Sequence, residues 1–292
     1  MAAHNGLSVG SQRFAGSLLY YLWVWLLSEE SNEQRSRHGH GNETFPFRFE
    51  VLVSKDFKLK YRRSILGVLW SVLNPLLMMI VLSAVFSFMF RFQIENYPLY
   101  LILGQVLFSL MTDATTSAMT SIIDASPLLK KVRVEKMVFP LEKVVFGLVN
   151  FAISLIAVLA VMVFFQVIPT WRVLLIPVML IFVSLFCVGL GLLLSSLAVF
   201  FRDVIHLWGV VTTAWMYATP IFYPLELLPD TQQNLMAWNP MYQYITYFRD
   251  IMMNGVTPSL ETHLICFGMA AITFLVGLVA FRKTEHKFIL YV

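Results

Sequence analysis

Six apolar segments, each close to 20 residues long, dominate this chain and limit what it can fold into. A helix needs about 20 consecutive apolar residues to cross the hydrocarbon core of a bilayer. Only 13% of the 292 residues are charged, against about 25% in soluble domains, which leaves too little polar surface to coat a water-soluble globule. We therefore predict an all-α integral membrane protein with six transmembrane helices, at residues 71–90, 99–122, 144–167, 173–200, 204–223 and 260–281.

Lysine and arginine are unevenly divided among the loops that join these runs. Alternate loops carry most of them, whereas the loops on the other side hold only Arg91, Arg172 and Arg249. Because cytoplasmic loops of membrane proteins carry the excess of Lys and Arg, we predict that both termini are cytoplasmic and that the segment after the fifth run is external. The net charge of +4 follows from this topology, and we expect no nucleic-acid partner.

Two segments precede the first run. Residues 1–46 are an N-terminal extension, with an aromatic-rich interfacial anchor followed by a polar, flexible linker. Residues 47–70 alternate basic and apolar side chains and predict a cytoplasmic amphipathic helix at the membrane surface. Its cationic side chains are suited to the phosphates of lipids, and we assign this contact to Lys60, Arg62 and Arg63. The six-helix domain then covers residues 71–292.

A stripe of aromatic and hydroxyl side chains lies within the fifth run. Its members recur at spacings of four, three, four and three, which places them on one helical face. Indole rings alternating with threonine hydroxyls suit a surface that meets sugar rings. An interfacial aromatic belt combined with ordinary helix packing is the alternative. The stripe consists of Trp208, Thr212, Trp215, Thr219 and Phe222.

The second run has a polar face that includes Asp113 and Thr116. An ionisable group inside a membrane segment is a candidate for function, because an unpaired charge in hydrocarbon is costly. A contact with water or with a neighbouring helix is the simpler explanation. We expect this face to line a passage.

The segment at 225–254 is too polar to span the membrane, yet it is rich in Trp, Tyr, Met and Leu. Pro229 and Pro240 divide it into two short helices, which we expect to be re-entrant or interfacial. We predict that this external segment acts as a lid, with candidate residues Tyr223, Trp238, Asn239, Arg249 and Asp250.

The loop between the second and third runs begins a helix at Ser126 and Pro127. A short helix that is apolar on one side and basic on the other suits docking into the groove of a partner protein. A solvated basic loop is the alternative. The candidate docking residues are Leu128, Leu129, Lys130, Lys131, Arg133 and Lys136.

Several short motifs occur in a fixed order along the second half of the chain: FRD at 201–203, PIFYP at 220–224, LP at 228–229, NP at 239–240 and RD at 249–250. In this order and spacing they resemble ABC-2-type permeases, and most closely the exporters of O-antigen, teichoic acid and related polysaccharides. The motifs DFKLKYR at 56–62 and SILG at 64–67 resemble the opening of the same family. The resemblance therefore covers the chain from about residue 47 to its end.

This resemblance implies a multi-pass protein of the bacterial cytoplasmic membrane, in which two permease copies pair as a homodimer with two ATPase subunits. Trp70, the stripe and the polar face of the second run would line a channel for a lipid-linked polysaccharide. The docking residues would contact the ATPase. Where the family has an aromatic residue followed by Phe-Pro, this chain has Arg133-Val134-Glu135, and the end of the docking helix departs from the family there.

The chain contains no GxxxxGK[ST], HExxH, GxSxG or CxxC motif. We therefore predict a non-catalytic permease without a cofactor or metal of its own, whose ATP and Mg are bound by the partner subunit. An ABC-2 exporter of drugs or small lipids is the first alternative. The second is a membrane-embedded glycan or lipid transferase, which needs an acid–base pair. Asp113 and His206, on different runs, are the candidates for it.

Overall fold

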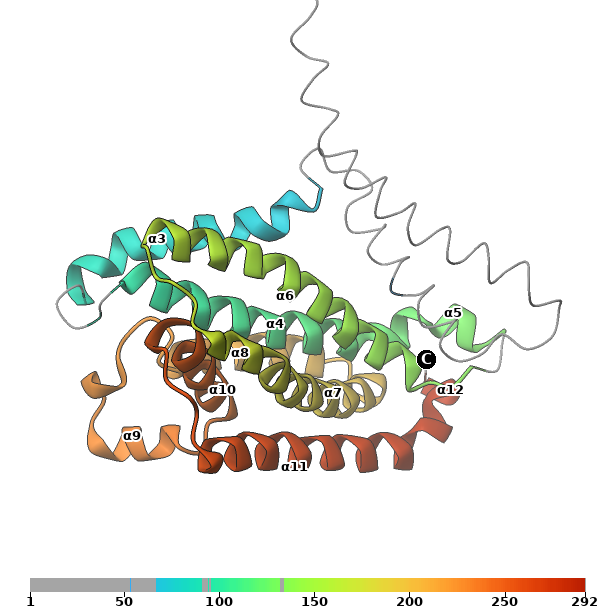
Figure 1. The fold of residues 1–292 in the computed structure, drawn as a ribbon. Helices are drawn as coiled ribbons and strands as arrows, with labels where there is room; N and C mark the ends of the chain where they lie inside the picture. Colours follow the sequence, from blue (N-terminus) through green and yellow to red (C-terminus); the bar gives the residue numbers. More distant parts are fainter. Residues whose placement is uncertain (1–52, 54–66, 91–93, 95, 132–133, 292) are drawn as a thin grey trace, which may run out of the picture.

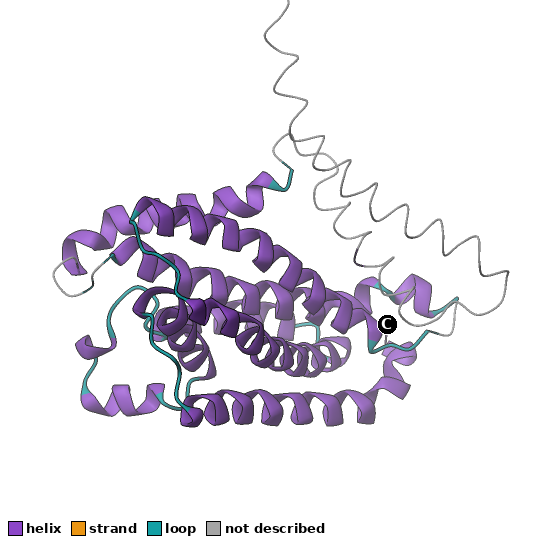
Figure 2. Ribbon diagram, in the orientation of Figure 1, coloured by secondary structure: helices purple, strands orange, loops and turns teal. Residues whose placement is uncertain are grey.

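The computed structural model describes residues 53, 67–90, 94, 96–131 and 134–291, and all regular structure in this part of the chain is helical (Figure 1, Figure 2). The predicted extension at 1–46, and nearly all of the amphipathic segment at 47–70 with Lys60, Arg62 and Arg63, lie outside the described residues.

Within the described part of the chain, five helical segments are long and apolar enough to cross a membrane. They are α3 (Leu69–Phe90), α4 (Tyr97–Asp124), α6 (Val138–Phe164), α7 (Ile176–Phe200) with the preceding turn η1 (Trp171–Leu175), and α11 (Leu260–Thr284). The shorter elements are α5 (Ser126–Leu129), α8 (Val204–Ala218), η2 (Leu225–Leu227), α9 (Asp230–Met236), α10 (Pro240–Arg249), η3 (Asp250–Asn254), η4 (Glu285–Lys287) and α12 (Phe288–Tyr291).

The predicted continuous helix over residues 204–223 is wrong, because α8 ends at Ala218 after 15 residues. At a rise of about 1.5 Å per residue it spans about 22 Å, less than the ~30 Å of a hydrocarbon core. Thr219 has extended backbone angles, with φ −86° and ψ 139°. A residue that precedes proline is driven out of the helical region, and Pro220 has no N–H for the helix to use.

The two short helices predicted between the fifth and sixth runs are present. Each begins at its proline: α9 directly follows Pro229, and α10 has Pro240 as its first residue. Proline is favoured there because the first turn of a helix leaves its N–H groups unused. How these helices lie relative to a bilayer stays a prediction.

Helix α4 is the centre of the bundle. It contacts α3, α6, α7, α8 and α10, and most of its residues are buried. α3 lies beside α6 along one edge and α11 runs along the opposite edge, while α9 and α12 lie at opposite ends of the bundle (Figure 1). Large apolar side chains are exposed on the outer faces of α3, α6, α7 and α11, as expected for helices that meet lipid.

α7 and α11 approach closely through two glycines. A Cβ atom at Gly277 would overlap the backbone carbonyl of Gly189, and a Cβ at Gly189 would overlap the backbone at Thr273. Small residues allow membrane helices to pack with their backbones in contact. The close contact between α7 and α11 therefore requires glycine at both positions.

Replacing Gly277 by alanine is expected to destabilise the protein by about 2 kcal/mol or more, because overpacking typically costs about 1–3 kcal/mol and a backbone atom cannot move aside. Thermal unfolding of the purified protein in detergent measures the effect. Gly268→Ala, on the same helix with no atom within 4 Å of the added carbon, is the control and should not lower the melting temperature. Equal melting temperatures for the two variants would contradict the backbone contact.

Candidate functional site

A buried arginine joins the end of α10 to the broken end of α8. Arg249 is only 5% exposed. Its Nε and Nη2 donate to the carbonyl oxygen of Tyr100 at 3.2 and 3.1 Å, Nη1 donates to that of Pro220 at 2.9 Å, and Nη2 also donates to that of Ile221 at 3.1 Å. The guanidinium carbon lies 3.4 Å from the centroid of the Tyr100 ring. One side chain thus holds together α4, α10 and the segment after α8.

The carbonyl groups after α8 need these donors because the chain is no longer helical there. Backbone groups in an apolar environment must be satisfied from within the protein. Besides Arg249, the Tyr97 hydroxyl donates to the carbonyl of Phe222 at 2.8 Å, and the Tyr100 hydroxyl lies 3.2 Å from the carbonyl of Pro220 and 3.0 Å from that of Tyr223. Every carbonyl oxygen from residue 220 to residue 223 is therefore within reach of a side-chain donor.

The charge of Arg249 survives its burial. Desolvation lowers the pKa of the guanidinium to about 10, which leaves it protonated at neutral pH. Gly104 on α4 supplies the space, since a Cβ atom at this position would lie 2.7 Å from Nη2 of Arg249 and 3.2 Å from the Ile221 side chain. The arginine and the glycine are a matched pair.

The aromatic stripe faces the interior of the protomer. Trp208, Thr212 and Trp215 share one side of α8, as their spacing predicts, and Thr219 and Phe222 follow after the helix ends. Four of the five are buried, and Trp215 is partly buried. The outer face of α8, which includes Leu207, Val210 and Val211, is exposed instead. The predicted face exists, it forms part of the packing of this chain, and its role in a channel stays a prediction.

Trp215 is held by specific contacts. Its Nε1 donates to Oδ1 of Asn239 at 2.9 Å, and its ring packs edge-on against Phe108 and Phe186. Asn239 also donates to the Thr219 hydroxyl at 3.0 Å and accepts from the first backbone N–H groups of α10. This amide therefore caps α10 and fastens it to the end of α8.

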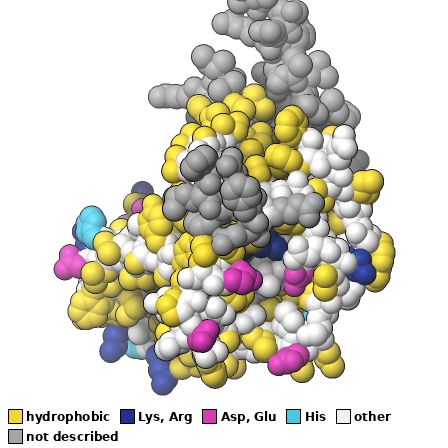
Figure 3. Space-filling view, turned by 90° about the vertical axis from the view of Figure 1, so that its left-hand side faces the viewer, with side chains coloured by type: hydrophobic (Ala, Val, Ile, Leu, Met, Phe, Trp, Pro, Cys, Tyr) yellow, Lys and Arg dark blue, Asp and Glu magenta, His cyan; other side chains and the backbone are white. Residues whose placement is uncertain are grey.

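The residues predicted to form a lid differ from one another in their exposure and in their contacts. Arg249 and Asn239 are structural links, and Trp238 is 81% exposed. The Tyr223 hydroxyl donates to the carbonyls at 217 and 218. Asp250 accepts from the Asn254 amide at 2.9 Å, and partial burial raises its pKa. Figure 3 views the end of the molecule that carries α9, where charged side chains are scattered among apolar and polar ones. A lid role stays a prediction.

A polar cavity of about 460 Å³ lies between α3, α4 and α6. Trp70 and Asp113, two of the residues predicted to line a passage, are both on its wall. Thr116 is exposed one turn further along α4. The cavity is lined by side chains from three helices. The sequence analysis predicted only some of these side chains for a passage, and it missed Asn74, Gln105, Asn150 and Ser154.

The predicted docking helix is a single turn, α5. Leu128 is 42% exposed, and Lys130 and Lys131 are exposed directly after it. Leu129, in contrast, is buried. Arg133 lies outside the described residues. Among the described candidate docking residues, one leucine and two lysines are thus exposed.

Lys136 contacts the C-terminal tail. Its Nζ donates to the carbonyl of Glu285 and lies 5.8 Å from the centroid of the Phe288 ring. Phe288 is completely buried, in a cluster with Leu129, Phe139 and Phe281. The tail therefore packs against the loop that carries the candidate docking residues. Four consecutive apolar residues at 288–291 are the sequence signal for it.

A buried carboxylate lies near the start of α6. Glu142 is 2% exposed, and its Oε2 is 3.2 Å from Nζ of the neighbouring Lys143.

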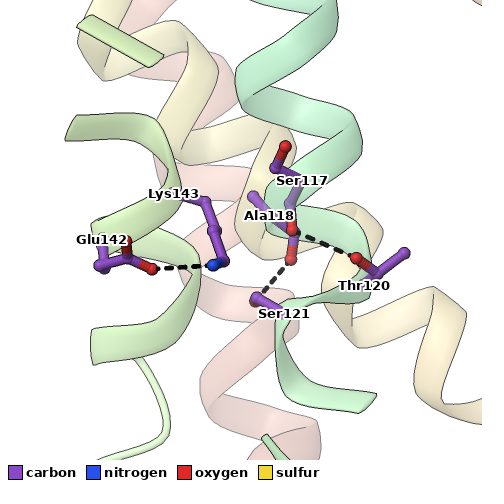
Figure 4. Close-up of polar contacts among 6 residues, drawn as sticks. All are labelled: Ser117, Ala118, Thr120, Ser121, Glu142 and Lys143. Carbon is purple, nitrogen blue, oxygen red and sulfur yellow. Dashed lines mark hydrogen bonds and ion pairs between the residues drawn. The ribbon is translucent and has the colours of Figure 1, made fainter. Parts of the chain in front are cut away.

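On α4, beside this ion pair, Thr120 and Ser121 donate to backbone carbonyls of their own helix (Figure 4). By bonding back to their own helix in this way, Thr120 and Ser121 satisfy their hydroxyls without a partner from another helix. Among the described residues, no group of three or more His, Cys, Asp and Glu side chains is placed to hold a metal ion.

Residues 48–253 match the family model described as ABC-2 type transporter. The chain belongs to this family. It is 34% identical over 212 residues to the O-antigen export system permease protein RfbA of Myxococcus xanthus, a match that covers 72% of this chain and 82% of that protein. The corresponding RfbA of Klebsiella pneumoniae is 30% identical over 242 residues, covering 82% and 92%.

More distant relatives include the capsule polysaccharide export inner-membrane protein CtrC of Neisseria meningitidis, 25% identical over 68% of this chain and 76% of that protein. By family and by its long apolar helices, this ABC-2 transporter is a multi-pass protein of the bacterial inner membrane. The matched range contains the cavity, the docking loop, the stripe and Arg249, whereas α11 and the C-terminal tail lie beyond it.

Replacing Arg249 by methionine in this ABC-2 transporter is expected to destabilise it by about 3 kcal/mol or more, because three buried carbonyls lose donors worth about 1–3 kcal/mol each. Arg249→Lys should recover little, since one ammonium group cannot reach three acceptors as a guanidinium does. Thermal unfolding in detergent measures both, with exposed Arg202→Met as the control. A methionine variant that melts with the control would disprove the structural role of Arg249.

Proposed function

We propose that this chain is the permease subunit of an ABC exporter that moves a lipid-linked cell-envelope polysaccharide across the cytoplasmic membrane. The observation that carries the proposal is the similarity to two O-antigen export permeases, at 34% and 30% identity over most of their lengths. The capsule polysaccharide export protein CtrC and the polysialic acid transport protein KpsM of Escherichia coli are less similar, at 25% and 21% identity, which favours a substrate of the O-antigen type.

The energy for this transport comes from a separate ATPase subunit in our proposal, since the chain lacks a phosphate-binding loop of its own. Two permease copies form a homodimer and bind two ATPase subunits. The ATPase contacts the exposed residues Leu128, Lys130 and Lys131, together with Arg133. Leu129 and Lys136, which are engaged inside the protomer, position this loop.

The proposed orientation places α5, α12 and both termini on the cytoplasmic side. Exposed cationic residues gather at this end of the bundle, at 130–131, 202 and 282–283, and cytoplasmic ends of membrane helices carry the excess of such residues. The non-helical segment from residue 220 to residue 223 completes the crossing that α8 begins. Its carbonyls are satisfied by side chains, which makes a non-helical backbone tolerable at membrane depth.

Lys60, Arg62 and Arg63 contact the phosphates of the lipid carrier in this proposal. Cations next to the first span are suited to anionic groups at the cytoplasmic surface. The segment at 225–254 covers the external end of the passage.

The proposed function is tested by deleting this chain in its own bacterium. Lipid-linked polysaccharide should then accumulate on the cytoplasmic side and disappear from the cell surface, as measured with an antibody against the glycan on intact and lysed cells. Supplying the wild-type chain should restore surface glycan, but only when its ATPase subunit is active. A deletion strain with normal surface polysaccharide and no internal accumulation would exclude this function.

The docking assignment predicts the effect of a charge reversal. Lys130→Glu combined with Lys131→Glu should reduce the ATPase that co-purifies with the permease at least tenfold at physiological salt, because like charges across an interface repel. Arg282→Glu with Lys283→Glu, an exposed basic pair at the same end of the bundle, is the matched control. If the first variant retains its ATPase as well as the second does, the loop is not the docking site.

A further inference from the structure

The cavity between α3, α4 and α6 is polar although it lies among membrane helices. Seven hydrogen-bonding side chains line it, and the indole of Trp70 adds a flat apolar surface. Polar groups inside a membrane segment are costly, and where they gather around a space they indicate a ligand or a pathway. The seven are Ser71, Asn74, Gln105, Ser109, Asp113, Asn150 and Ser154.

Gln105 is the clearest sign that the cavity serves a ligand. Its Oε1 is buried and has no hydrogen-bond partner among the described residues. A buried acceptor without a donor costs about 1–3 kcal/mol, and a leucine of similar size would avoid this cost. Ser109 and Asp113 follow Gln105 at intervals of four residues, so all three are on one face of α4.

The opposite walls supply complementary groups. Trp70 and Asn74, four residues apart, come from α3, and Asn150 and Ser154, also four apart, come from α6. Trp70 is 48% exposed, so its ring is accessible. Three amide side chains, three serine hydroxyls and one indole, contributed by three helices, thus line the cavity.

We propose that this cavity binds an uncharged sugar residue of the exported glycan. The proposal rests on the proposed export function and specifies which part of the substrate the protomer recognises. A pyranose ring has hydroxyl groups at its edge and C–H groups on its faces, which match amides and hydroxyls beside an indole. Six of the seven polar side chains are uncharged, which suits hydroxyl groups better than a phosphate. The volume of about 460 Å³ is within the range of about 300–1,000 Å³ for small-ligand pockets.

This site is distinct from the stripe on α8. Thr212, Trp215 and Thr219 of the stripe are occupied by contacts within the protomer, such as the bond from Trp215 to Asn239, whereas the buried Nε1 of Trp208 has no partner among the described residues. The cavity surrounds an open space of about 460 Å³ and has an acceptor that no described residue satisfies. Recognition of sugars by the cavity therefore needs no rearrangement of α8.

The test is sugar binding by the purified transporter, with permease and ATPase subunits together. The probe is an oligosaccharide of a few residues cut from the bacterium's own glycan, with affinity measured by calorimetry. Gln105→Leu should weaken binding at least tenfold and Trp70→Ala should do the same, while Gln105→Leu keeps or raises the melting temperature because it removes an unpaired buried acceptor. Ser83→Ala, which removes a buried unpaired hydroxyl that is not part of the cavity wall, is the control and should bind as wild type.

Three outcomes overturn the proposal: Gln105→Leu binding the oligosaccharide as tightly as wild type, wild type binding no oligosaccharide, or inorganic phosphate displacing the oligosaccharide from the wild-type site. The last result would assign the cavity to the phosphate of the lipid carrier. Each of these leaves the proposed function intact as long as the wild-type chain restores surface glycan in the deletion strain. Loss of that restoration would instead count against the function itself.

Discussion

The architecture depends on the charge of Arg249 inside an apolar protein. An ion in such a place persists only where fixed dipoles replace its hydration. Here the dipoles are the backbone carbonyls of Tyr100 on α4 and of Pro220 and Ile221 after the end of α8. The same carbonyls are tolerable only because the guanidinium supplies their donors. Neither group would be stable without the other, so the break after α8 and the buried arginine form one unit.

This unit makes α10 and the end of α8 a rigid extension of α4. Arg249 bonds to the Tyr100 carbonyl on α4, and Asn239 joins the start of α10 to Thr219 and Trp215. A segment fastened at one end to the most buried helix of the bundle and at the other end to α8 cannot open like a flap on its own. Motion at this end of the protein therefore has to involve α4, whose other end leads directly into the loop at α5 that we propose as the docking site.

Hydropathy and proline positions predicted the five long helices and the starts of α9 and α10, because both depend on local chemistry. The end of α8 was missed, since hydropathy counts apolar residues and ignores the backbone angles that Thr219 takes before Pro220. Periodicity placed Trp208, Thr212 and Trp215 on one face. It carries no information on whether that face meets a substrate or the chain's own α4 and α7. The same limit hid Phe288, whose burial depends on a contact with a distant loop.

Hydrogen bonding distinguishes the part of the stripe around Asn239 from the wall of the cavity between α3, α4 and α6. Where every polar atom already has a partner, as at Trp215, Thr219 and Asn239, a substrate has to break existing bonds before it forms new ones. Where an acceptor such as Gln105 Oε1 lacks one, a ligand gains a bond without that cost. Weak, repeated binding of a moving polymer favours the second arrangement, so the surface between α3, α4 and α6 is better suited to a glycan than the aromatic face of α8.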